Sequence, residues 1–179
     1  NAGGRAVVPG LNETHVHAAG AARGEVNAPF IQLGSIAEIQ DWIRQRAQDL
    51  PRGAWIQAPR VDVTRILERR MPTKAELDVA APDRPAVFVW QYANRQLQIL
   101  NSAALKKTGI TKDTAAPKGG TIHLDENGEP NGLLENSGAL TSKFLPRPEI
   151  SEAAWLDSLA KLLHVYNQLG ITSITERNS

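Results

Sequence analysis

Apolar residues recur at helical spacing in two long segments, 36–50 and 152–169, and these segments predict amphipathic helices. A serine precedes each segment and is expected to cap it. Ser35 also stands three residues before Glu38, which predicts a capping box in which the Glu38 carboxylate binds the Ser35 amide. Shorter helices are predicted at 74–80, behind a second capping box at Thr73 and Glu76, and after Asn101 or Ser102.

Short apolar runs between these helices predict strands, and the chain is therefore of the α/β class. The last helix, a glycine and then residues 171–175 form the second half of a strand–helix–strand unit. Residues 18–34 are rich in alanine and glycine and have weak periodicity, so they predict a loop. The remaining strands are expected at 11–16, 54–61 and 86–90, and in a hairpin of 121–124 with 132–134 around Asn127–Gly128.

Composition and charge narrow the possible partners. The 179 residues suit one domain or slightly more, and 20 basic against 19 acidic residues give no reason to expect a nucleic-acid or membrane partner. Cysteine is absent, which excludes disulfides, thiolate zinc sites and a cysteine nucleophile, but leaves open whether a soluble protein is cytoplasmic or exported. The first residue is not methionine, so we expect a piece of a longer protein.

Two histidines one residue apart, His15 and His17, are the strongest chemical signal. On a strand they would share a face with Glu13, with Cα atoms about 7 Å apart, and could converge on one ion such as Zn, Mn, Fe or Ni. The alternative is a chance pair at the edge of a loop. A catalytic zinc site needs about three protein ligands, and neither His123 in the hairpin nor His164 on a solvated helix face is expected to supply one.

The stretch VVPGLNETHVH (7–17) resembles the first barrel strand of the amidohydrolase superfamily, whose motif is Pro-Gly-hydrophobic-hydrophobic-Asp-x-His-x-His. Asn12 and Glu13 depart from that motif, where a hydrophobic residue and Asp are usual. Four more stretches resemble, in order, the N-substituted formamide deformylase-like branch of the superfamily: RRMPTKAELDVAAPDRPAVFVW (69–90), LNSAALKKTGIT (100–111), GGTIHLDENGEPNGLLE (119–135) and LGITSITE (169–176).

The resemblance implies a metal-dependent hydrolase with a (β/α)8 barrel, of which this chain holds the first strands. Residues 5–19 and 145–179 would be the barrel elements, namely strand 1, a helix and strand 2, and residues 20–144 an α+β insertion domain. A complete barrel needs about 250 residues. The chain is therefore expected to be an N-terminal fragment that is inactive alone.

By the same resemblance, the intact protein would hydrolyse an amide or related C–N bond of a small-molecule substrate with water activated by a divalent metal, one or two ions, with zinc the expected metal. His15 and His17 would be metal ligands, and the catalytic base would lie outside this chain. Gln96, where many relatives carry a histidine, is a candidate substrate contact. Glu135 and Glu176 are further candidates, against the alternatives of a helix-start carboxylate and a loop charge.

Two other interpretations stay open. Residues 34–135 could form a non-catalytic module for substrate binding or oligomerisation, or the chain could be a complete small α+β domain with an incidental histidine pair. An incomplete barrel would expose apolar surface, so we also expect a homo-oligomer or a dimer with swapped elements.

Overall fold

The computed structural model describes residues 2–28, 31–145 and 149–177. The chain divides into two compact units, which are described separately. Unit 1 comprises Asn1–Pro29 with Pro148–Ser179, and unit 2 comprises Phe30–Arg147. Among the described residues, no helix has the length and apolar character needed to cross a membrane.

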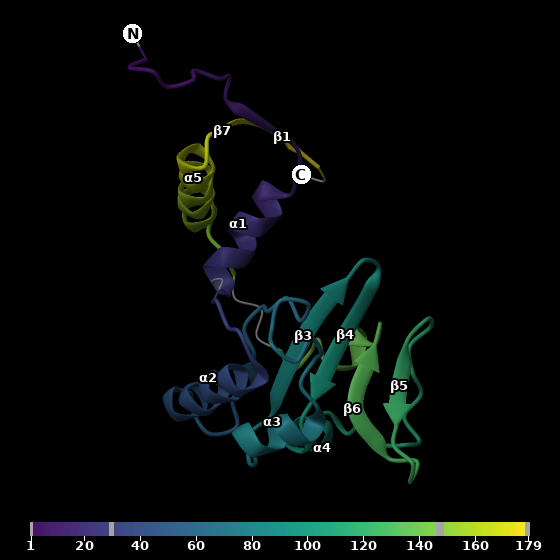
Figure 1. Cartoon of the computed structure of the whole chain (residues 1–179). Helices are drawn as coiled ribbons and strands as arrows, with labels where there is room; N and C mark the ends of the chain where they lie inside the picture. Colours follow the sequence, from purple (N-terminus) through teal and green to yellow (C-terminus); the bar gives the residue numbers. More distant parts are fainter. Residues whose placement is uncertain (1, 29–30, 146–148, 178–179) are drawn as a thin grey trace. The chain divides into compact units, whose positions relative to one another are not determined.

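Unit 1 is a parallel strand pair with two helices. Strand β1 (Leu11–Val16) pairs in parallel with β7 (Ile171–Glu176), and the strands carry helices α1 (Ala18–Asn27) and α5 (Glu152–Gln168). Figure 1 shows α1 and α5 beside each other, on the same side of the two strands. The predicted strand at 11–16 and the predicted last helix and strand are confirmed.

Helix α1 corrects the prediction of a loop over 18–34. Its buried residues are Ala18 and Ala22, four positions apart on one face. The indole N–H of Trp155 and the hydroxyl of Ser158, both on α5, donate to the carbonyls of Ala19 (3.0 Å) and Ala22 (2.9 Å). Small alanines allow this close approach, and their high helix propensity supports the helix without a wide apolar stripe.

Unit 2 is built on a five-stranded sheet with the order β2-β3-β4-β6-β5. Its first two strands are parallel and the other pairs are antiparallel. The strands are β2 (Ile56–Gln57), β3 (Ala86–Tyr92), β4 (Arg95–Leu100), β5 (Thr121–Leu124) and β6 (Pro130–Glu135). The predicted hairpin at Asn127–Gly128 is confirmed as β5 and β6.

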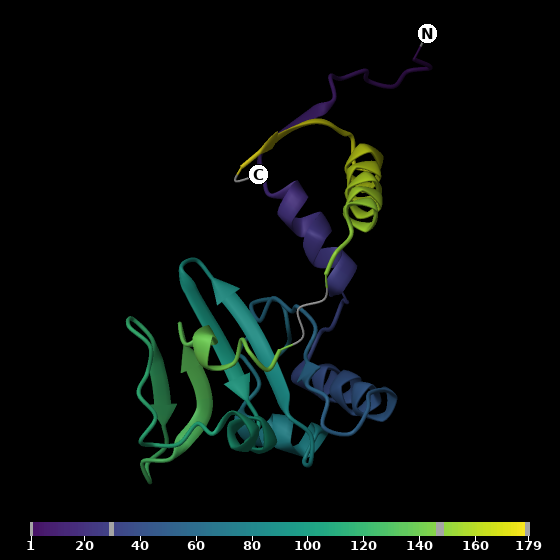
Figure 2. The ribbon, with the colours of Figure 1, turned by 180° about the vertical axis from the view of Figure 1, so that it is seen from behind.

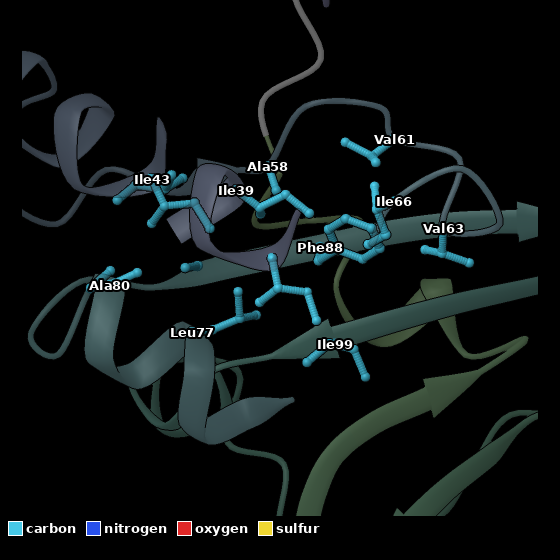
Figure 3. Packing of buried hydrophobic residues seen from close by; sticks show 14 residues of the cluster. Ile39, Ile43, Ala58, Val61, Val63, Ile66, Leu77, Ala80, Phe88 and Ile99 are labelled. Carbon is cyan, nitrogen blue, oxygen red and sulfur yellow. The ribbon is translucent and has the colours of Figure 1, made fainter. Parts of the chain in front are cut away.

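Side chains alternate across this sheet and form a core on each face. On one face, Phe88 and Ile99 pack against α2 (Ile36–Asp49) and α3 (Lys74–Ala80) (Figure 3). On the other face, α4 (Ser102–Thr108), the short 3-10 helix η1 (Gly138–Leu140) and the residues after it cover a second apolar cluster that contains Val87, Leu100 and Leu134. The sheet is therefore the middle of three layers.

The helix starts follow the capping residues. Thr73 and Glu76 form the predicted capping box, and Asn101 caps α4 by accepting from the Ala104 amide. Ser35 caps α2 as predicted, but the Glu38 carboxylate accepts from the Gly34 amide (2.9 Å) instead of the Ser35 amide.

One predicted strand is shorter than expected, and one strand was missed. The strand expected at 54–61 is reduced to the two residues of β2. The Ala58 amide still donates to the Val87 carbonyl (2.8 Å), and Pro59, which has no amide hydrogen, follows it. Strand β4 was not predicted, although Leu97 and Ile99 alternate with Gln96 and Gln98 along it.

The fold is mixed α/β with two open sheets, and the described residues form no closed barrel. The expected insertion begins at residue 20, whereas the first unit of the structure runs to residue 29, because α1 packs on α5. The assignment of the units to a barrel part and an insertion domain stays a prediction.

Candidate metal centre

The two histidines of the H-x-H motif lie at the carboxyl end of β1. His15 is the penultimate residue of the strand, and His17 is the N-cap residue of α1. Their rings are edge to face, with centroids 5.4 Å apart. Two imidazoles bound to one tetrahedral ion through nitrogens at about 2.0–2.1 Å have centroids roughly 5 Å apart. The separation therefore fits two ligands of a single ion.

The orientation of His17 is set by the neighbouring strand. Its Nδ1 makes a short hydrogen bond to the carbonyl oxygen of Arg177, the residue that follows β7, and the Arg177 amide donates to Val16 (2.8 Å). Because a carbonyl oxygen can only accept, Nδ1 carries the proton, and the lone pair of the neutral ring is on Nε2. A metal-binding histidine commonly has this arrangement, with one nitrogen held by a backbone carbonyl and the other free.

The donor set in the described residues is incomplete. No three His, Cys, Asp or Glu side chains are grouped there so that they could hold an ion. The Glu13 carboxylate accepts from the His15 amide (3.0 Å). The residues present therefore fit two positions of a metal site and leave the others to be supplied from elsewhere.

Glu176 lies at the end of β7, on the side of unit 1 where the histidines are. One carboxylate oxygen, Oε2, accepts from the Ala19 amide (3.0 Å) in the first turn of α1, where a negative charge is favourable. The other oxygen, Oε1, is buried without a hydrogen-bond partner among the described residues. Glu176 thus ties β7 to the helix that begins at His17.

The other two candidates, Gln96 and Glu135, belong to unit 2. The expected alternative for Glu135, a helix-start carboxylate, is wrong, because the residue ends β6. Its carboxylate makes a two-pronged ion pair with Arg95 (2.6 and 3.0 Å) on the neighbouring strand. This hydrogen bonding holds the pKa of Glu135 below its ordinary value, with a smaller contribution from His123, whose Nε2 lies 3.6 Å from Oε2. The carboxylate is therefore committed to a cross-strand pair.

Gln96 lines an open hollow of about 600 Å³ on unit 2. Three other lining residues, Gln98, Asn136 and Thr141, were not singled out from the sequence. The alternation of Gln96 and Gln98 with Leu97 and Ile99 is a sequence signal for one polar sheet face, but that pattern alone gives no sign that the polar face is covered.

Comparison with known proteins identifies relatives. The pattern of the Amidohydrolase family matches residues 1–179. N-substituted formamide deformylase of Arthrobacter pascens is 31% identical over 177 residues, covering 96% of this chain and 32% of that protein. Putative amidohydrolase YtcJ of Bacillus subtilis (strain 168) is 32% identical over 131 residues, covering 73% and 24%. Protein LONG AFTER FAR-RED 3 of Arabidopsis thaliana is 29% identical over 137 residues, covering 75% and 22%.

No solved structure gives a significant match. The chain spans a third or less of the length of these three relatives. The family pattern nevertheless covers its whole length, and the H-x-H pair lies within it. The chain belongs to the amidohydrolase family.

Proposed function

We propose that this chain contributes the first two metal ligands of a metal-dependent hydrolase that cleaves an amide or related C–N bond of a small molecule. The observation that carries the proposal is the His15–His17 pair, with rings 5.4 Å apart at the end of a strand and with His17 Nδ1 bonded to a backbone carbonyl. Membership of the amidohydrolase family supports the reaction class. The name of the Arthrobacter relative points to N-substituted formamides as the first substrates to test.

In this proposal, His15 and His17 would hold a divalent ion, with zinc the preferred choice for two imidazole ligands. When bound, such an ion lowers the pKa of a coordinated water and polarises the carbonyl of the substrate. The Arg177 carbonyl fixes the tautomer and the orientation of His17. The bond from the Ala19 amide to Glu176 holds the start of α1, and therefore the backbone of His17, against β7.

We place β1 and β7 as neighbouring strands of a (β/α)8 barrel. Their parallel pairing, with helices between them in sequence, supports this placement. The histidines then lie at the carboxyl ends of the strands, where barrel enzymes carry out their chemistry. The remaining ligands and the catalytic base are expected beyond these 179 residues, and the chain alone is expected to be inactive.

The reaction is tested on a protein of the relatives' full length that contains this chain, with N-substituted formamides and other simple amides as substrates. We expect zinc-dependent release of the amine, reduced at least about 100-fold in His15→Ala and in His17→Ala, since ligand loss removes the metal. His164→Ala is the matched control, because that imidazole is exposed on α5 and bonds to Gln168 in the same helix. Full activity of both ligand variants would overturn the proposal.

A further inference from the structure

Most residues that line the hollow on unit 2 have uncharged polar side chains, and the others are Gly138, Ala139 and Leu145. Figure 2 shows the segment that follows β6 crossing one face of the sheet. The hollow is lined by residues of β3, of β4 and of this segment. None of its described lining residues is charged. Five of them carry carboxamide side chains: Gln91, Asn94, Gln96, Gln98 and Asn136.

Strand register brings these carboxamides together. Gln91 of β3 and Gln96 of β4 are directly opposite in the antiparallel ladder, and Gln98 follows two residues later on the same face. Asn136 follows β6 and closes the third side, with its backbone amide donating to the Gln96 carbonyl (2.8 Å) and its Oδ1 accepting from the Gln96 amide (2.9 Å). Asn136 has a left-handed backbone (φ 47°), a conformation that asparagine adopts more readily than most residues other than glycine.

Gln98 is a largely buried polar residue of this lining. Gln98 is only 4% exposed. Its neighbour on the same face of β4, Leu100, is apolar and belongs to the buried cluster. Gln98 Oε1 accepts from the Thr141 hydroxyl (2.9 Å), but Gln98 Nε2 donates no hydrogen bond to any residue that the structure describes. Among the described residues, Gln98 Nε2 is not one of the buried side-chain atoms that lack a partner, so it reaches the open hollow, where its N–H groups are available to a ligand.

Glycine at position 138 keeps the hollow open. A Cβ there would overlap Gln96 Oε1 and would lie 3.6 Å from Gln98 Nε2. Gln96 can therefore keep its present place in the lining only because residue 138 has no side chain, whereas the distance to Gln98 is that of an ordinary van der Waals contact. The same position offers a way to change the hollow while sparing the sheet, because the overlap involves the far end of a flexible side chain.

We propose that this hollow is a binding site for the uncharged carboxamide group of a small molecule. The Gln98 and Asn136 amides supply N–H donors for a ligand carbonyl, and Gln96 Oε1 supplies an acceptor for a ligand N–H. A carboxylate would lack the N–H for that acceptor, and a cation would find no countercharge. The site lies within unit 2, so it does not depend on the metal ligands of unit 1.

The test is a titration of the chain with N-acetylglycinamide, followed by the side-chain NH2 resonances of glutamine and asparagine in NMR spectra. We expect saturable shifts of the Gln98 and Asn136 signals with a dissociation constant of about 1–20 mM, as befits a ligand of few atoms. Acetate and glucose are the comparison probes and are expected to leave these signals in place.

Gln98→Leu should abolish saturable binding without lowering the thermal midpoint of unit 2. Leucine fills the buried volume, and the Thr141 hydroxyl keeps its hydrogen bond to the Gly138 carbonyl (3.1 Å). Gly138→Ala should weaken binding at least about fivefold by displacing Gln96. Gln45→Leu, the same chemical change on the exposed face of α2, should bind as the parent does. Equal shifts with acetate or glucose, no saturable shift with N-acetylglycinamide, or undiminished binding by Gln98→Leu would each overturn the proposal.

Discussion

Removing the Asn101 side chain is the sharpest test of how unit 2 is held together. The residue is fully buried and all its side-chain hydrogen bonds are made. Its Oδ1 accepts from the amides of Ala86 and Ala104 (2.9 Å each), at the start of β3 and in the first turn of α4. Its Nδ2 donates to the carbonyls of Ala81 and Arg84 (2.7 Å each), after α3. One side chain therefore joins three elements.

The magnitude follows from these four bonds. Asn101→Ala removes them together, at about 1 kcal/mol net for each, and this sum includes the loss of the α4 cap, itself worth about 1 kcal/mol. We expect the free energy of unfolding of unit 2 to fall by about 4 kcal/mol. That is a large part of the 5–15 kcal/mol typical of whole domains. Asn101→Asp keeps both acceptor bonds but sets a carboxylate against two carbonyls, so it should also destabilise strongly.

The assay is urea unfolding followed by tryptophan fluorescence, since three of the four tryptophans (Trp42, Trp55 and Trp90) belong to unit 2. Asn127→Ala is the matched control, an asparagine exposed at the hairpin turn, and it should change stability by less than about 0.5 kcal/mol. A loss below about 1 kcal/mol for Asn101→Ala would show that these four hydrogen bonds do not hold unit 2 together, because the four buried groups would then be satisfied some other way.

Two further predictions concern acid stability and helix packing. Hydrogen bonding, first from Arg70 and then from Thr73, lowers the pKa of Glu76 from 4.5 to about 2, so its contribution is complete above pH 4.5 and is lost as the pH falls toward 2. Solvent screening limits this contribution to about 1 kcal/mol, and thermal melts across that pH range should show it for the parent chain and not for Glu76→Gln. Ala22→Leu should overpack the α1–α5 contact and destabilise unit 1 by about 1–3 kcal/mol. Ala21→Leu, on the exposed side of α1, should leave the stability unchanged. The hydrogen-exchange rates of the α1 amides should therefore rise in Ala22→Leu and stay as in the parent chain in Ala21→Leu.

Local chemistry explains which elements could be predicted from the sequence. In the Thr73–Glu76 capping box and in the Asn101 cap, a side chain bonds to a backbone amide three residues later. These interactions are local, so the two helices start where they were predicted. Helix α1 could not be found in this way, because its packing face is only Ala18 and Ala22 and its stabilising contacts come from α5, more than 130 residues later. Tertiary contact decided its structure, and periodicity did not.

The candidate site likewise has a part that local sequence predicts and a part that depends on distant residues. The spacing of His15 and His17 is local, and it indicates a metal pair without any structure. The partner that orients His17 is a backbone carbonyl 160 residues away, which carries no side-chain signal. Glu135 was a candidate because of its position in a resembling stretch, but its ion pair with Arg95 depends on the strand order of the sheet. Pairing across strands is the information that the sequence lacked.

Whether His15 and His17 bind one ion together can be measured by 15N NMR of the histidine rings during titration of the chain with Zn²⁺. We expect the signals of His17 Nε2 and of one nitrogen of His15 to shift together as zinc binds, while His17 Nδ1 stays protonated toward the Arg177 carbonyl. Two ligands should give a dissociation constant well above about 1 µM. Shifts at His123 and His164 equal to those at His15 and His17, or zinc binding through His17 Nδ1, would show that the two histidines do not form a metal pair.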